Sequence, residues 1–169
     1  TRVEAVQPYF ERFVAALAEV EDLAEVPEDR LLKLWEGLGY YNRARNLKKA
    51  AQAVNEIYGG ELPSSREELL KLPGIGSYTA GAIASIAYGL PLPEVDGNVL
   101  RVLSRVLASY RDILKQSTKR WMEDLLATVI PETRASQFNQ GLIEIGAVVC
   151  IPNGQPKCGE CPLASVCLA

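Results

Sequence analysis

The chain has 169 residues, of which 48% are hydrophobic and 23% charged, so its length and composition suit one domain or two small ones. A net charge of −3 and a pI of about 5.2 exclude a chain that is basic throughout, so any contact with nucleic acid must come from a local patch or from helix N-termini. The absence of histidine excludes Ser-His-Asp and Cys-His catalysis and histidine metal sites.

Charged residues interrupt every apolar run of the sequence before it reaches the length of a membrane span. The chain opens on Thr1-Arg2-Val3-Glu4, which has none of the features of a signal peptide. We therefore expect a cytoplasmic protein without a membrane-spanning segment.

The first part of the chain has the apolar periodicity of helices. Apolar residues recur at three- and four-residue spacing over residues 3–17 and predict a first helix. A proline and two acids at residues 27–29 are typical of a helix N-terminus and predict a second helix as far as Trp35. A long third helix is predicted from about residue 44 to residue 58, because two glycines follow it.

The rest of the chain is also helical in pattern. Ser65-Arg66-Glu67-Glu68 is typical of a capping box and predicts a short helix after it. Further helices are predicted at about 97–109, 117–129 and 135–149, and no segment alternates with the period of a strand. We therefore expect an all-α fold, and prolines at 91 and 93 mark the best boundary between two helical subdomains.

The segment Leu72–Gly81 predicts a short helix, a tight turn at Gly74 and Gly76, and a second helix of small residues. Glycine is favoured where the backbone takes a positive φ or where another segment approaches closely. Backbone N–H groups at the start of the second helix, at Ser77 and Thr79, suit a DNA phosphate, which positions a protein without reading sequence. The alternative is an ordinary joint between helices with a glycine cap.

Asp96 directly precedes the helix predicted at 97–109. An aspartate at a helix start is usually an N-cap that contributes about 1 kcal/mol. The alternative is a catalytic carboxylate, which can offset a positive charge that develops during a reaction. Asn98 would position a water or the carboxylate itself, or would serve only as a capping side chain.

All four cysteines lie in the last twenty residues, with the spacing C-x7-C-x2-C-x5-C. A metal site is favoured over two disulfides in a chain of cytosolic character. Zinc and a four-iron cluster both accept four thiolates, so the ligands alone leave both open. The candidate ligands are Cys150, Cys158, Cys161 and Cys167.

Residues 37–49 combine a glycine turn, the adjacent aromatics Tyr40 and Tyr41, and four basic residues. Such a composition can insert a side chain into a duplex and hold the duplex backbone. The alternative is the basic, solvated start of a helix.

These segments together resemble one family. The hairpin string, followed by Asp96-Gly97-Asn98, resembles the helix-hairpin-helix DNA glycosylases of the endonuclease III and MutY superfamily, and residues 37–47 resemble the MutY type in particular. The cysteine spacing resembles the family's cluster motif, C-x6-C-x2-C-x5-C, with one extra residue within 151–157. The resemblance spans Thr1 through Ala169.

The resemblance implies a helix-hairpin-helix glycosylase fold made of two subdomains. A six-helix-barrel subdomain would occupy residues 1–92 and contain the hairpin at about 65–88. An iron–sulfur cluster subdomain would occupy residues 93–169, with the catalytic aspartate at its start. The N-terminal segment and the C-terminal 8-oxoguanine recognition domain of the family would lie outside this chain.

The resemblance also implies roles for individual residues. Asp96 would be catalytic with Tyr78 and Asn98, and the four cysteines would hold a [4Fe-4S] cluster. Gln140 would hydrogen-bond the flipped base, although it is also explained as a polar residue on an apolar helix. Tyr40 would enter the base stack, and the residues expected to contact DNA are Thr1, Leu38, Tyr40, Arg43, Arg45, Gly74, Gly76, Ser77 and Thr79.

Where bifunctional members carry a lysine that forms a Schiff base, this chain has Ser77-Tyr78-Thr79. The resemblance therefore implies a monomeric, monofunctional glycosylase that removes adenine mispaired with guanine or 8-oxoguanine in double-stranded DNA, in the cytoplasm and at the nucleoid of a bacterium. Its general-acid glutamate would lie ahead of Thr1, so we expect residues 1–169 alone to have little activity. The alternatives are a thymine-mismatch glycosylase of the same superfamily and a non-catalytic DNA-binding module.

Overall fold

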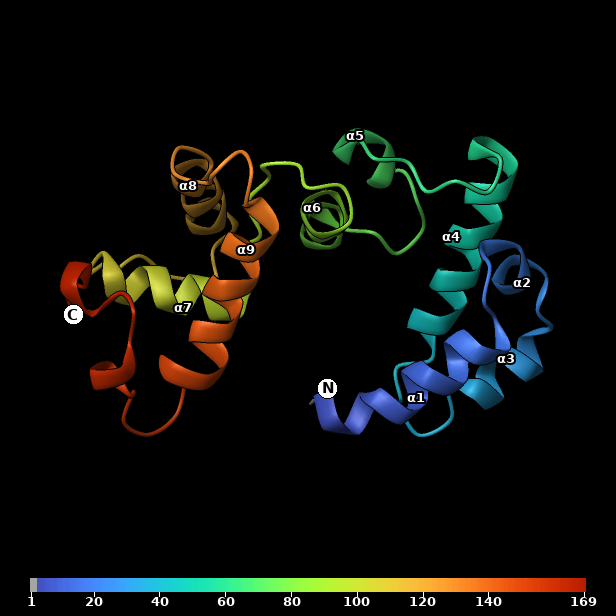
Figure 1. Cartoon of the computed structure of the whole chain (residues 1–169), viewed down its shortest axis with the longest axis horizontal. Helices are drawn as coiled ribbons and strands as arrows, with labels where there is room; N and C mark the ends of the chain where they lie inside the picture. The colour runs from blue at the N-terminus through green and yellow to red at the C-terminus, as the bar shows by residue number, and fades with distance from the viewer. Residues whose placement is uncertain (1–2) are drawn as a thin grey trace. The chain divides into compact units, whose positions relative to one another are not determined.

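The computed structural model describes residues 3–169, and all regular secondary structure in that range is helical (Figure 1). The prediction of an all-α fold is therefore confirmed. The chain forms two compact units, Thr1–Gly76 and Ser77–Ala169. The subdomain boundary that we predict between residues 92 and 93 stays a prediction. No helix in the described range is long and apolar enough to cross a membrane.

Unit 1 is built on the long helix α4, which begins two residues before the prediction and ends as predicted at Tyr58, where Gly59 adopts φ 64° as a left-handed C-cap. The sequence pattern missed α2, because six residues are too few to show a helical period. Its start is fixed by Asp22, whose carboxylate accepts the backbone N–H groups of Ala18 and Glu19 at 3.0 and 3.1 Å. The helices of unit 1 are α1 (Val3–Ala16), α2 (Val20–Glu25), α3 (Glu28–Leu34), α4 (Asn42–Tyr58) and α5 (Arg66–Leu69).

The core of the first helices of unit 1 is small. Leu17, Val26, Leu31 and Ala44 are buried together, and the rings of Phe13 and Trp35 pack edge to face beside them. From α4, Lys48 Nζ donates to the Val26 carbonyl at 2.6 Å. Val26 is the residue that ends α2, and Lys48 bonds its carbonyl. Helix α4 therefore holds both the preceding helices and the loop that joins them.

Unit 2 surrounds the buried face of α7. Val99, Val102 and Leu103 of this helix pack against apolar side chains of α8 and α9, Met122, Leu126 and Leu142 among them. The helical stretch predicted over 135–149 is present, and the chain changes from α-helix to a π-helical turn at Ile145. The elements of unit 2 are α6 (Ser77–Ile86), α7 (Gly97–Val106), α8 (Gln116–Ala127), α9 (Ala135–Glu144), η1 (Ile145–Val149), η2 (Cys158–Glu160) and η3 (Ala164–Val166).

Candidate active site and cysteine cavity

Asp96 uses both carboxylate oxygens at the start of α7. Oδ1 accepts the backbone N–H of Val99 at 2.8 Å, which is the bond of an N-cap, and Oδ2 accepts from Asn98 Nδ2 at 3.0 Å. The side chain is half-buried. The capping role that the sequence allowed is therefore present, and the same two bonds hold the carboxylate in one orientation.

A chain of hydrogen bonds runs from Asp96 to the first cysteine. Asn98 Oδ1 accepts from Arg101 Nη2 at 2.9 Å, and Arg101 Nε donates to the Cys150 carbonyl at 2.9 Å. Arg105 Nη1 donates to Cys150 Sγ at 3.1 Å. No local sequence pattern marks these two arginines, because Cys150, the partner that they share, lies more than forty residues away along the chain.

Gly146 lies directly against Asn98. A Cβ atom at Gly146 would lie 2.6 Å from Asn98 Cβ and 3.0 Å from Asn98 Cα, closer than real contacts allow. The Gly146 carbonyl accepts from Arg101 Nη2 at 2.6 Å. The π-turn η1 therefore brings its backbone onto the start of α7 at a position where only glycine fits.

Tyr78 lies near two acids of unit 2. Its side chain is 39% exposed, and its pKa is raised first by partial burial and then by the nearby negative charge of Asp96. The hydroxyl is therefore protonated at neutral pH and can donate a hydrogen bond. The structure brings Tyr78 into the electrostatic neighbourhood of Asp96, as the catalytic prediction requires.

Asn139 is a buried residue that the sequence interpretation passed over in favour of its neighbour. Its Nδ2 donates to Ser85 Oγ and to the Leu92 carbonyl, both at 2.8 Å, and its Oδ1 accepts the Glu94 backbone N–H at 3.2 Å. These bonds fix residues 92–94, which lead into Asp96, against α6 and α9. Gln140 is exposed, and its Nε2 donates to Ser136 Oγ at 2.8 Å, so its role in a base pocket stays a prediction.

The hairpin has the turn that the sequence predicted. Gly74 adopts φ 79°, and a Cβ atom there would lie 2.7 Å from Asn46 Cβ of α4. The Ile75 backbone N–H donates to the Leu72 carbonyl at 3.2 Å and closes the turn. Helix α6 begins at Ser77, with no acidic residue in its first turn to compete with an anion. Gly74, Gly76 and Thr79 are exposed and Ser77 is half-buried.

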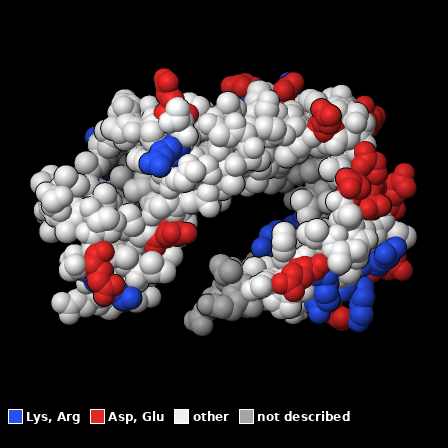
Figure 2. Space-filling model, viewed as in Figure 1, with Lys and Arg blue, Asp and Glu red and all other residues white. Residues whose placement is uncertain are grey.

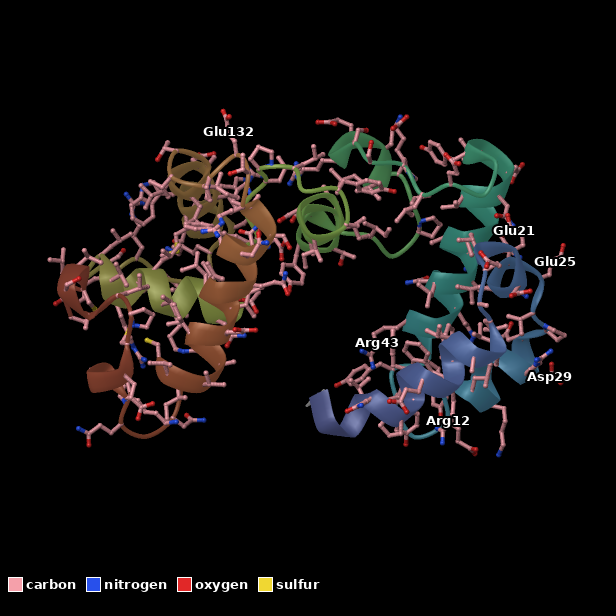
Figure 3. All side chains as sticks on the ribbon, in the orientation of Figure 1. Arg12, Glu21, Glu25, Asp29, Arg43 and Glu132 are labelled. Carbon is pink, nitrogen blue, oxygen red and sulfur yellow. The ribbon has the colours of Figure 1, made fainter. Side chains whose placement is uncertain are left out.

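Tyr40 is the most unusual residue of unit 1. It adopts φ 49°, a left-handed conformation that costs free energy for any residue except glycine, and its side chain is 85% exposed. Arg43 lies over the ring of Tyr40 at 5.7 Å and over that of Trp35 at 5.4 Å (Figure 3). An exposed aromatic side chain held in a strained backbone conformation is typical of a recognition element. Leu38 beside it is half-buried.

The four basic residues of this segment do not form one free patch. Arg45 pairs with Glu28 at 2.8 Å, and Lys48 donates to a backbone carbonyl within unit 1. Acidic and basic side chains also intermingle around α1 and α3 on the face shown in Figure 2. Arg43 is therefore a better candidate for a phosphate contact than Arg45. Thr1 lies outside the described residues.

All four cysteines line one cavity of unit 2, with a volume of about 320 Å³. Most of its other lining residues are apolar, and Arg105 is the basic residue among them. Within residues 3–169, no three acidic or cysteine side chains converge closely enough to hold a single metal ion. The four cysteines thus line a common cavity, and their thiols do not meet at one position.

Comparison with known proteins identifies the family to which the chain belongs. Residues 1–128 match the family described as HhH-GPD superfamily base excision DNA repair protein. The chain belongs to this superfamily. The predicted resemblance is therefore confirmed, as is the type of fold.

Several HhH-GPD relatives carry the same name, "Adenine DNA glycosylase". The protein of Buchnera aphidicola subsp. Baizongia pistaciae is 40% identical over 99% of this chain and 47% of its own length. The protein of Homo sapiens is 41% identical over 100% of this chain and 31% of its own length. The chain thus spans less than half the length of these relatives.

Solved structures in this superfamily share the fold of the chain. A thermostable thymine-DNA glycosylase superimposes with a TM-score of 0.86 at 30% identity, over 96% of this chain and 75% of its own. A non-covalent endonuclease III–DNA complex gives a TM-score of 0.81 at 31% identity, over 98% and 75% of the two chains.

Proposed function

We propose that the protein carrying this chain is a monofunctional DNA glycosylase that excises adenine mispaired with guanine or 8-oxoguanine. One observation carries the proposal: the Asp96 carboxylate is held at the start of α7 by Val99 and Asn98, in the electrostatic neighbourhood of Tyr78. In a superfamily of base excision repair proteins, a fixed carboxylate without a lysine at the hairpin suits hydrolysis of the N-glycosidic bond.

Asp96 would stabilise the positive charge that develops on the sugar as the adenine leaves. A carboxylate fixed before the reaction loses little free energy to reorganisation during it, which makes its electrostatic effect large. Tyr78 would donate a hydrogen bond from its protonated hydroxyl, and Asn98 would keep the carboxylate oriented. Water would then attack the sugar. The assignment of Gln140 to the flipped base belongs to this proposal and rests on the resemblance alone.

Double-stranded DNA is the proposed partner. The exposed turn at Gly74 and Gly76 and the N-terminus of α6 at Ser77 and Thr79 suit a phosphate of the backbone. Tyr40 would insert into the base stack, because its ring is exposed and its backbone is held in a strained conformation. We infer that the protein acts as a monomer in the cytoplasm of a bacterium, at its nucleoid.

We infer that the cysteine cavity holds a [4Fe-4S] cluster. The spacing C-x7-C-x2-C-x5-C resembles the cluster motif of the superfamily, and this resemblance favours the cluster over zinc. The four cysteines line one largely apolar cavity of about 320 Å³, which is compatible with such a group. Cys150, Cys158, Cys161 and Cys167 would be the ligands, and the Arg105 N–H would stabilise the Cys150 thiolate. The cluster would supply structure, since base hydrolysis requires no electron transfer.

We predict that the protein purified without oxygen contains about four iron atoms per chain and absorbs broadly in the visible range. The change Cys161→Ser should lower both values and the stability of unit 2, because it removes one ligand from the cavity. Ser165→Ala, an exposed change within η3, should leave both values unchanged. Colourless protein with one zinc per chain would contradict the cluster.

The absence of a lysine at Ser77-Tyr78-Thr79 predicts the type of product. Protein expressed from the complete native gene should release a base and leave an intact strand that breaks only after alkali, because no amine at this position can attack C1′. Borohydride should trap no covalent complex with DNA. Strand cleavage without alkali, or a borohydride-trapped adduct lost on changing a lysine elsewhere, would show a bifunctional enzyme.

A thymine-mismatch glycosylase is the second candidate, because a thymine-DNA glycosylase shares the fold at 30% identity. The two candidates differ in the base that is released and share the roles proposed for Asp96 and the cysteines.

A further inference from the structure

Glu94 is a buried acid two residues before Asp96. Its side chain is 1% exposed, and neither carboxylate oxygen has a partner at ordinary hydrogen-bond distance among the described residues, although the Ser85 hydroxyl lies near enough to favour the charged form in part. Burying a carboxylate charge with so little compensation is strongly unfavourable, whereas burying the protonated acid costs far less free energy. The packing around Glu94 therefore selects its uncharged form.

The groups that face Glu94 offer it no positive charge. Helix α6 presents Tyr78 and Ser85, and a Cβ atom at its Gly81 would be in ordinary contact with Glu94 Cγ, at 3.8 Å. Helix α9 presents Asn139, which binds the Glu94 backbone N–H. The remaining charged neighbour is Asp96 itself. Burial and then the Asp96 charge raise the pKa of Glu94, and the Ser85 hydroxyl offsets part of that rise.

We propose that Glu94 is a positioning residue that carries a proton in the folded protein, so that Asp96 alone bears the negative charge where the chain enters α7. The protonated side chain fills the contact with α6 and keeps a second charge away from Asp96 and Tyr78. An ionised Glu94 would place a second negative charge beside Asp96 and bury a desolvated charge against α6. The inference goes beyond the proposed function and does not depend on which base is released.

The sign of the pH dependence follows from the proton. The ordinary pKa of glutamate is 4.5, so Glu94 of the unfolded chain loses its proton as the pH rises through this value. The folded state holds the proton to a higher pH, because the pKa of Glu94 is raised there. Folding is therefore favoured most below pH 4.5, and its free energy falls as pH rises toward the folded pKa of Glu94. Within this window the unfolding constant should rise about tenfold per pH unit from this one group.

The test compares Glu94→Gln with the unchanged chain by urea unfolding at a series of pH values above 4.5. Glutamine keeps the shape and cannot ionise, so the ratio of the unfolding constants, unchanged chain over variant, should rise about tenfold per pH unit and then level off. Glu132→Gln, which changes an exposed acid between α8 and α9 (Figure 3), should give a ratio that stays nearly constant. A flat or falling ratio for Glu94→Gln would overturn the proposal.

A second measurement needs no folded Glu94 variant. In the unchanged chain labelled with ¹³C at glutamate carboxyl carbons, one resonance should titrate well above the others, and Asp96→Asn should move that titration to lower pH. The removal of a like charge has this effect only on a neighbouring acid. A set of glutamate resonances that all titrate near the ordinary pH would show that Glu94 is ionised in the fold.

Discussion

In protein from the complete native gene, Asp96→Asn is expected to slow base release by about 100-fold or more, the size of effect found when a preorganised electrostatic group is removed from an active site. Asparagine is as good an N-cap as aspartate, so the backbone N–H of Val99 keeps its partner. The bond from Asn98 is the one at risk, and its loss should cost about 1 kcal/mol of folding free energy. Single-turnover base release and urea unfolding measure the two effects separately.

Asp112→Asn provides the matched control for this change. Asp112 is exposed, and its carboxylate also accepts a backbone N–H, that of Leu114 at 2.9 Å. Both variants should keep most of their stability, and only Asp96→Asn should lose the reaction. Base release by Asp96→Asn at the unchanged rate would reduce Asp96 to a helix cap.

Gly146→Ala is expected to destabilise unit 2 by about 1–3 kcal/mol, because the added methyl group meets the backbone of Asn98, which cannot rotate away. The same displacement should disturb the bonds from Asn98 to Asp96 and from Arg101 to the Gly146 carbonyl. We therefore expect base release to fall as well. Urea unfolding and single-turnover kinetics of the variant check both effects.

Gly141→Ala is the control on the same stretch of chain. Gly141 lies inside α9, and a Cβ atom there would meet nothing within 4 Å. Alanine favours a helix interior over glycine, so this variant should be about 0.5–1 kcal/mol more stable. If Gly146→Ala proved as stable as Gly141→Ala, the result would contradict the close packing of η1 on α7.

Local sequence signals predicted most of the helices. Ser65 is the N-cap of α5 as expected, with its hydroxyl accepting the Glu68 backbone N–H at 3.2 Å, and Gly59 ends α4 as expected. Such features depend on residues within one turn of each other, which a sequence displays directly. The change to a π-turn at Ile145 was not predicted, because its contact with the rest of the fold joins Gly146 to Asn98, far away along the chain.

The candidate site was predictable to a smaller extent. Motifs pointed to Asp96, Tyr78 and the cysteines, and the structure gathers the four cysteines around one cavity. The bonds from Arg101 to Cys150 and from Glu94 to Asn139 left no local trace, since each joins residues more than forty positions apart. Glu94 was missed because nothing in the sequence distinguishes a buried acid from an exposed one.

The most direct test of the proposed function is the identity of the base released in single turnovers. Protein from the complete native gene should be mixed with duplexes that contain one A:8-oxoguanine, A:G or T:G pair. The proposal predicts adenine release from the first two duplexes and an intact T:G duplex. Release of thymine, or release of no base while the duplexes are bound, would contradict it.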